Sequence, residues 1–217
     1  MVRIDFLHGS FCIDTTEVTN AQFNAYVAAG SPLLSHLPGG CKSDTLAPQM
    51  VQDPSLANRP VSGEAITFCY AQSYCEWAGK RLCGQLGDGG FVAHLTDPNE
   101  WSYACSNGVK DTIFPYGDKF VDGACNTGSD ATAEAGTYAA CHGFEAEFAK
   151  TFDLVGNVAE YINNADDGGN LAAAGASYST AYNKAGYPVG AGCVLGVNFN
   201  GANQGLDQVG FRCCANE

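Results

Sequence analysis

The chain has 217 residues, the length of one domain, and a net charge of −13 without any cluster of lysine or arginine. This charge argues against nucleic acid and anionic membrane surfaces as partners. No apolar run reaches 18 residues, so no transmembrane helix and no membrane insertion are expected. We therefore expect one domain over residues 1–217.

Eleven cysteines are scattered along the chain, and no two of them have the Cys-x-x-Cys spacing of zinc ribbons or thioredoxin-type sites. This pattern favours a disulfide framework formed in an oxidising compartment, so we expect a secreted or cell-surface protein. The odd number leaves at least one thiol free or bonded to another chain. No signal peptide is visible, and the chain is therefore expected to be the mature piece of a longer precursor.

The first predicted elements are two strands and a helix. One strand begins at Met1, and the next covers residues 11–14. Thr19 and Gln22 have the spacing of a capping box, which predicts a helix over residues 20–29. The apolar residues of this helix form one face, which we expect to point into the protein core.

A second helix is predicted over residues 62–78, because its aromatic and aliphatic residues fall near one stripe. The run Asp-Pro-Asn-Glu, with Asp as the cap and Pro at the first position, predicts a helical turn over residues 97–105. Short strands are predicted over residues 91–96 and 209–215. Four glycine-rich stretches are predicted as long loops: 84–90, 123–136, 166–175 and 186–205.

Three short runs follow one another in a fixed order: YCEWAGKRL at 74–82, LVGNVAE at 154–160 and GFRCC at 210–214. Together they resemble the formylglycine-generating enzyme (sulfatase-modifying factor) family. Further runs are similar to motifs of that family: EVTNAQF at 17–23, EWSYA at 100–104, FPYGD at 114–118 and CNTG at 125–128. The resemblance implies an α+β fold of the C-type-lectin-like type, with few short strands and helices and long disulfide-stapled loops.

The resemblance also implies two disulfides, Cys75–Cys213 and Cys105–Cys193. Two further pairs are hypotheses: Cys12–Cys214, which would tie the terminal strands together, and Cys125–Cys141, which would close a local loop. No pairing follows for Cys41, Cys69 and Cys83.

Catalysis in the family needs two cysteines after a GGSY turn, whose soft thiolates bind copper(I) and activate oxygen. Here the matching turn is GASY at residues 175–178, and the two cysteine positions fall on Thr180 and Ala185. Neither side chain can bind copper(I), so no copper site is expected. The four histidines lie far apart without the spacing of an iron site: His8, His36, His94 and His142.

Calcium is the cofactor that the resemblance favours instead. Asn126, Asn157 and Glu160 keep side chains that match oxygen ligands of the family, and hard calcium prefers such oxygens. The alternative is that Asn157 and Glu160 only form hydrogen bonds within their turn.

The favoured function is a non-catalytic secreted or surface module that binds a protein or a glycan, or that forms part of an extracellular assembly. Only 15% of the residues are charged, which fits burial of some surface in self-assembly. The expected recognition face is residues 162–208, with four binding candidates: Tyr178, Tyr182, Asn198 and Asn200. Two alternatives stay open: a copper-dependent, oxygen-using oxidoreductase of the formylglycine-generating type, and a ligand-binding protein with diversified C-terminal loops.

Overall fold

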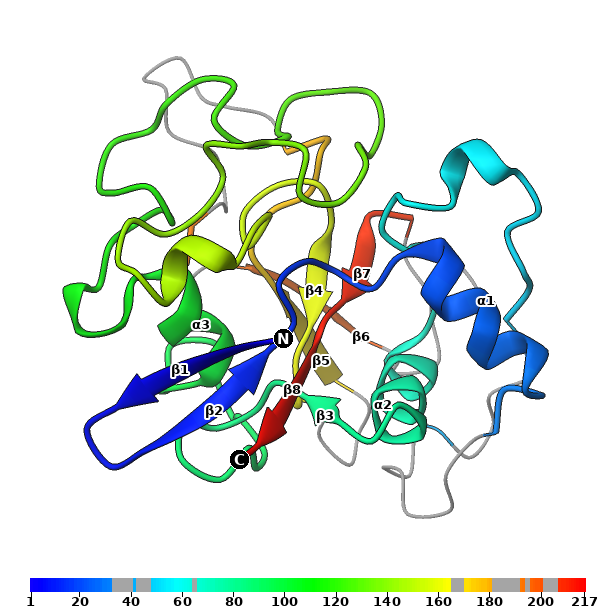
Figure 1. Cartoon of the computed structure of the whole chain (residues 1–217), viewed down its shortest axis with the longest axis horizontal. Helices are drawn as coiled ribbons and strands as arrows, with labels where there is room; N and C mark the ends of the chain where they lie inside the picture. Colours follow the sequence, from blue (N-terminus) through cyan, green and yellow to red (C-terminus); the bar gives the residue numbers. More distant parts are fainter. Residues whose placement is uncertain are drawn as a thin grey trace.

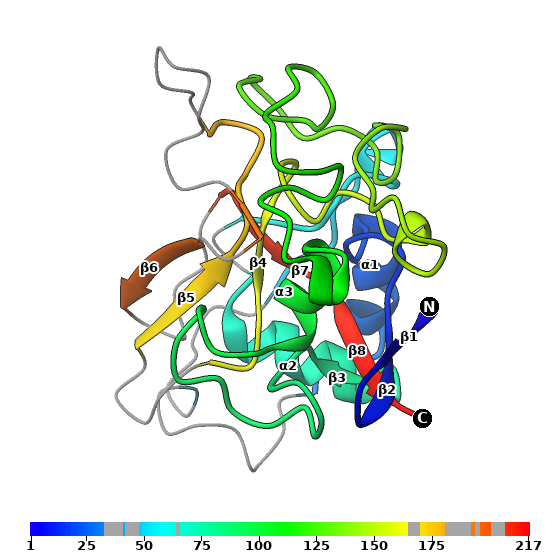
Figure 2. The same ribbon diagram turned by 90° about the vertical axis from the view of Figure 1, so that its left-hand side faces the viewer.

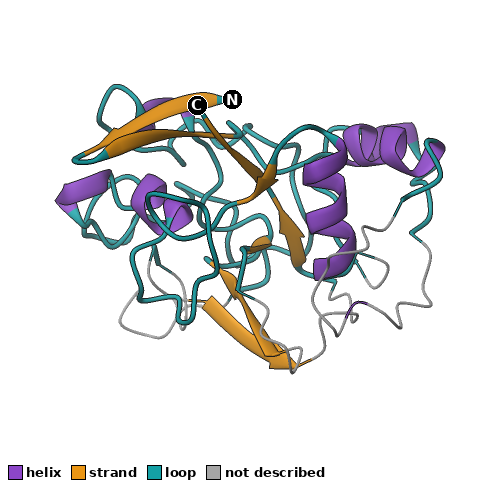
Figure 3. Cartoon of the chain, turned by 90° about the horizontal axis from the view of Figure 1, so that it is seen from below, coloured by secondary structure: helices purple, strands orange, loops and turns teal. Residues whose placement is uncertain are grey.

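The computed structural model describes residues 1–32, 41, 48–63, 66–164, 170–180, 192–193, 196–200 and 207–217. The strands form two four-stranded sheets; α1 (Asn20–Ala28) and α2 (Phe68–Trp77) lie on one side of the molecule, and α3 (Glu100–Cys105) and the N-terminal hairpin lie on the other (Figure 1). The two termini lie side by side (Figure 3), where Arg3 forms an ion pair of 2.7 Å with Glu217. No helix in these ranges is long and apolar enough to cross a membrane.

The first sheet contains both terminal segments of the chain. Its strand order is β1 (Val2–Phe6), β2 (Gly9–Ile13), β8 (Cys213–Asn216) and β3 (Arg81–Leu82), with all neighbours antiparallel. Ile4 lies opposite Phe11, and both side chains are buried against α3 and the loops around residues 125–155. The predicted strands at the N-terminus are confirmed.

The second sheet contains strands that follow the long central loops. Its order is β6 (Gly196–Asn200), β5 (Asn170–Ala174), β4 (Ala159–Tyr161) and β7 (Val209–Phe211), with β4 and β7 parallel. β5 and β6 lie next to each other at the left of Figure 2. The prediction of loops over 166–175 and 186–205 is wrong at these strands. Leu171 to Ala174 are all buried, so the run shows no apolar–polar alternation, and its small side chains resemble a loop.

Two longer helices cover the second sheet. In α1 (Asn20–Ala28), the Thr19 hydroxyl accepts a hydrogen bond from the Gln22 amide and the Gln22 side chain accepts one from the Thr19 amide, so the capping box is confirmed. The other helix, α2 (Phe68–Trp77), begins six residues later than predicted, because the Thr67 hydroxyl caps it.

The short helix α3 (Glu100–Cys105) also begins later than predicted. Asn99 caps it through a 2.8 Å bond to the Ser102 amide, whereas Asp97 accepts a bond from the His94 amide. Residues 91–96 form no strand; the Val92 amide bonds to the Asn163 carbonyl in a connecting segment. Three single-turn 3₁₀ helices complete the described elements: η2 (Pro54–Leu56), η3 (Gly108–Lys110) and η4 (Phe148–Lys150).

The strand predicted over residues 209–215 is two strands, because the chain passes from one sheet to the other at Arg212. β7 joins the second sheet beside β4, and β8 joins the first sheet between β2 and β3. Arg212, between them, is fully buried at 0% exposure. The chain therefore carries a charged side chain into the region between the two sheets.

Five disulfides join these elements: Cys41–Cys69, Cys75–Cys213, Cys83–Cys214, Cys105–Cys193 and Cys125–Cys141. Three of them are the expected pairs, but the Cys12–Cys214 hypothesis is wrong. Cys12 lies opposite Ala215 in the sheet, and Cys214 lies opposite Ile13, so the two cysteine side chains point to opposite faces. Cys12 is the free thiol.

Candidate functional site

The turn at residues 175–180 holds the positions at which the resemblance places catalytic groups. Gly175 has φ of +76°, and a Cβ there would lie 2.8 Å from the Leu154 carbonyl oxygen, so only glycine fits. The Tyr178 amide donates to the Asn157 carbonyl at 2.8 Å, and the Ser129 amide donates to the Tyr178 carbonyl at 2.7 Å. The turn is therefore fixed to the segments that carry Asn157 and Asn126.

Hydroxyl and amide groups occupy this turn. The Thr180 hydroxyl accepts a hydrogen bond of 3.0 Å from the Ser177 amide. The Ser177 hydroxyl donates to Gln208 Oε1 at 2.7 Å, and the Ser179 hydroxyl donates to the same oxygen. Such groups can bind hydroxyls and amides of a ligand, but they are not soft ligands for copper(I). Ala185 lies outside the described residues.

The cysteines provide no thiolate pair elsewhere. All eleven lie in the described part of the chain, and five disulfides occupy every one except Cys12. Cys193, the cysteine that follows the turn in sequence, is bonded to Cys105. Cys12 lies on β2 in the other sheet.

The side chains of Asn126 and Asn157 form a hydrogen bond with each other rather than facing an open metal site. Asn126 Nδ2 donates to Asn157 Oδ1 at 3.0 Å, and the Ala133 amide donates to the same oxygen at 2.8 Å. Asn126 Oδ1 accepts a 2.6 Å bond from the Ser129 hydroxyl. Both amide oxygens are therefore engaged within the protein.

Glu160 is engaged in a different interaction. Its carboxylate forms a bidentate ion pair with the Arg212 guanidinium. Arg212 Nε donates to Oε2 and Arg212 Nη2 donates to Oε1, each at 2.7 Å. Trp101 Nε1 also donates to Oε2 at 2.8 Å. The side-chain oxygens of the three residues expected to bind calcium thus accept hydrogen bonds from protein donors in this structure, and calcium binding by them stays a prediction.

Two further carboxylates surround Arg212. Glu17 and Asp153 are each 1% exposed, and among the described residues neither Glu17 oxygen nor Asp153 Oδ1 has a hydrogen-bond partner. Burial raises the pKa of Glu17 well above its usual range, and the neighbouring charge of Asp153 raises it further. Burial likewise raises the pKa of Asp153, to about 6.

Sequence reasoning did not single out this cluster of Glu17, Asp153 and Arg212. Each residue lies within or directly beside a motif run and is flanked by apolar residues, namely Val18, Leu154 and Phe211. A charged residue inside a buried apolar run was the available signal, because such a residue needs a partner.

The predicted binding residues fall in different parts of the described structure. Tyr178 is half-buried in the turn. Asn198 and Asn200 lie on β6, opposite Ala172 and Asn170, and only their backbone is described. Tyr182 lies outside the described residues. Among the binding candidates whose side chains the structure describes, Tyr178 lies in the turn with Ser177, Ser179 and Thr180.

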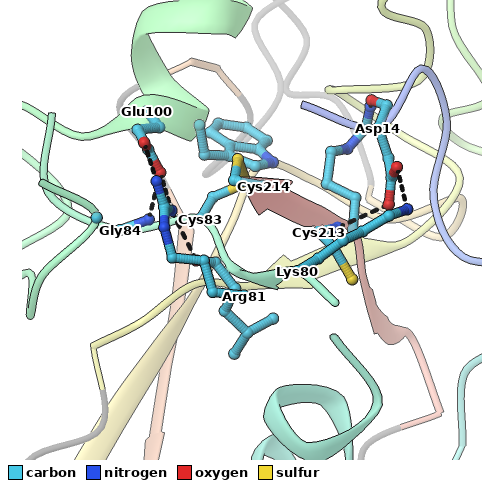
Figure 4. Close-up of a disulfide and its surroundings, with 12 residues drawn as sticks. Asp14, Lys80, Arg81, Cys83, Gly84, Glu100, Cys213 and Cys214 are labelled. Atoms are coloured by element: carbon cyan, nitrogen blue, oxygen red, sulfur yellow. Dashed lines mark hydrogen bonds and ion pairs between the residues drawn. A yellow bond between two sulfur atoms is a disulfide. The ribbon is translucent and has the colours of Figure 1, made fainter. Parts of the chain in front are cut away.

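A second group of potential metal ligands belongs to a disulfide. Ligand atoms of Cys83, Glu100 and Cys214 lie within 4.8 Å of one another, but the two sulfurs are bonded (Figure 4). Glu100 accepts hydrogen bonds of 2.5 and 2.6 Å from Arg81 and one of 3.0 Å from the Gly84 amide. This cluster is a structural link between β3, β8 and α3.

Comparison with known proteins identifies the family. The chain belongs to the family described as the sulfatase-modifying factor enzyme 1-like domain, whose model matches residues 3–217. No curated protein matches the chain in sequence.

Solved structures share the fold at low sequence identity. PvdO from Pseudomonas aeruginosa is 18% identical with a TM-score of 0.59, over 96% of this chain and 81% of its own. CarF is 16% identical with a TM-score of 0.58, over 100% of this chain and 95% of its own. Treponema denticola variable protein 1 is 15% identical with a TM-score of 0.53, over 96% of this chain and 85% of its own.

Proposed function

We propose that this protein is a non-catalytic extracellular module that uses the family scaffold to bind a protein or a glycan. The observation that carries the proposal is the state of the cysteines. Ten of them form five disulfides, and the remaining Cys12 is a single thiol on β2. A two-thiolate copper(I) site has no ligands in this arrangement.

The chemistry of the turn supports binding rather than catalysis. Ser179 and Gln208 are exposed and present a hydroxyl and an amide group, and the buried Ser177 hydroxyl holds the Gln208 side chain through a hydrogen bond. Groups of this kind recognise ligand hydroxyls and peptide groups through hydrogen bonds. The recognition face proposed here is the surface around residues 175–180 and 207–208.

A copper(I) titration tests the non-catalytic part of the proposal. Under anaerobic conditions the protein is titrated against a chromophoric copper(I) chelator, with Cys12→Ser as the matched control for the single thiol. We expect both proteins to leave the copper on the chelator. Tight one-to-one copper(I) binding through two sulfurs, together with oxidation of the cysteine in a Cys-x-Pro-x-Arg peptide, would establish an enzyme instead.

Self-assembly is the second form that the module can take, because its surface is weakly charged and one thiol is free. Light scattering coupled to size-exclusion chromatography distinguishes the two forms. A monodisperse monomer, with and without reductant, supports the ligand-binding form and excludes the assembly. A filament or a defined oligomer supports a structural subunit.

A further inference from the structure

A cavity of about 330 Å³ lies beside α3 and η3, and none of its lining residues belongs to the turn at 175–180. Its walls come from the segment before α3, from the Ser102–Ser106 side of α3 and from η3. The volume is at the lower end of the range of small-molecule sites, roughly 300–1,000 Å³. It therefore suits one side chain or a small group rather than a polymer.

The lining combines apolar walls with acidic groups. Leu86, Leu95 and Tyr103 supply apolar surface, and Asp97 and Asp111 supply two carboxylates. No lysine, arginine or histidine lines the cavity. The neighbouring Lys110 is exposed and lies 3.8 Å from Glu145, an ion pair outside the lining. The cavity thus has the chemistry to receive an apolar stem that ends in a positive charge.

Its walls are held in place by contacts with the core. The Tyr103 ring contacts the rings of Phe6, Phe11 and Phe148 with centroid distances of 6.3, 6.5 and 6.1 Å. Asp97 Oδ2 accepts a 2.9 Å bond from the His94 amide. Within the described ranges, no hydrogen bond occupies Asp97 Oδ1 or the Asp111 carboxylate. Two carboxylates without a protein cation therefore remain on a fixed frame.

We propose that this cavity binds an arginine side chain presented by a partner protein. The aliphatic stem of arginine lies well against leucine side chains, and its guanidinium matches a carboxylate through paired hydrogen bonds. The guanidinium also interacts favourably with an aromatic ring such as that of Tyr103. A second copy of this chain is a poor source of this side chain at Arg81 and Arg212, because these two are already paired with Glu100 and Glu160.

The surface beside the cavity fits a protein partner rather than a free ion. Val109, which lines the cavity, is 85% exposed. An apolar flank of this kind lets neighbouring residues of a partner bury surface around the anchoring arginine.

Two matched peptides test the proposal on the unmodified protein. Acetyl-Ala-Leu-Arg-Leu-Ala-amide is titrated into ¹⁵N-labelled protein, and the control peptide carries citrulline, a neutral near-isostere, in place of arginine. We expect the arginine peptide to shift the amide signals of Ser102 and Val109, with binding at least about fivefold tighter than that of the citrulline peptide and weaker at high salt. Equal binding of the two peptides, or no shift at these amides, would overturn the proposal.

A double variant tests the two carboxylates. Asp97→Asn keeps an oxygen for the His94 amide, and Asp111→Asn suits the φ of +53° at that position. We expect about five- to tenfold weaker binding of the arginine peptide to the double variant and unchanged binding to Asp122→Asn, an exposed site outside the lining. Undiminished binding to the double variant would contradict the assignment. The turn at 175–180 is intact in both variants, so this result is independent of the proposed recognition face.

Discussion

At the scale of single residues, the centre of the molecule is defined by one buried cation. Arg212 bonds to both oxygens of Glu160 and also donates to the carbonyls of Asp14 and Phe152, at 3.2 and 2.8 Å. Those two carbonyls belong to the segments that follow β2 and precede β4. Arg212 therefore links the backbone of distant segments at the point where the chain crosses between the sheets.

Removal of this cation should be strongly destabilising. Arg212→Met leaves Glu160 buried without its partner, and breaking a buried ion pair costs about 3–5 kcal/mol. We expect a large drop in the free energy of unfolding by denaturant titration. The matched control is Arg3→Met, because Arg3 forms only exposed ion pairs and its loss should barely change the unfolding midpoint. Similar midpoints for the two variants would contradict the role of Arg212.

The buried carboxylates make stability depend on pH. The folded-state pKa values of Glu17 and Asp153 are raised, so the folded protein holds these protons more tightly than the unfolded chain does. The stability that they contribute is complete below about pH 4, the unfolded value, and it declines as the pH rises through about 6 and beyond. The raised pKa values of Glu17 and Asp153 therefore make the protein more stable in mild acid than at alkaline pH.

Glu17→Gln tests this dependence. A neutral amide removes the cost of ionising a buried acid, on the order of 1–3 kcal/mol. We expect the variant to gain thermal stability over the unmodified protein at pH 8 and to differ little from it at pH 4. Asp122→Asn, at an exposed position, should show no such pH-dependent difference. A loss of stability at pH 8 would show that the Glu17 carboxylate has a stabilising partner.

At the scale of elements, disulfides carry much of the tertiary organisation. Cys213 and Cys214 are adjacent on β8, and they bond to Cys75 in α2 and to Cys83 just after β3. The two bonds span 138 and 131 residues. Such long links compensate for strands of only two to five residues.

The loss of stability on removing one of these long-range disulfides can be estimated from the length of the loop that it closes. In the chain-entropy model, a disulfide that closes a loop of this length contributes about 4–5 kcal/mol. We expect Cys75→Ser/Cys213→Ser to lower the midpoint of thermal unfolding strongly, whereas Cys12→Ser, which removes the free thiol, should leave it nearly unchanged. A small effect of the double variant would mean that hydrophobic contacts alone hold α2 against β8.

The sequence predicts an element well where local chemistry determines it. The capping box of Thr19 and Gln22 defines α1 because both bonds form within one turn. The sequence does not predict β5 and β6, because these strands are stabilised by pairing with each other across the sheet and β5 ends in three consecutive alanines. The same limit applies to the site. No local pattern indicates that Glu160 forms an ion pair with Arg212, because the two residues are 52 positions apart in sequence.

At the scale of the whole molecule, the chain keeps the family fold, and Thr180 and Ala185 stand at the positions where the resemblance places the catalytic cysteines. The family model spans residues 3–217, and the motif runs lie at the junctions of helices, sheets and disulfides. The turn at residues 175–180 keeps its backbone contacts but carries Thr180 in place of a cysteine. Its hydroxyl and amide groups are suited to binding a ligand.

The most direct test is a count of free thiols in the unreduced protein. The protein is unfolded in denaturant, alkylated without reductant and analysed by peptide mass spectrometry. We expect one alkylated cysteine, Cys12, and five linked pairs that include Cys105–Cys193. Two or more alkylated cysteines in the properly folded protein would contradict it, because a thiolate pair for copper(I) would then be available.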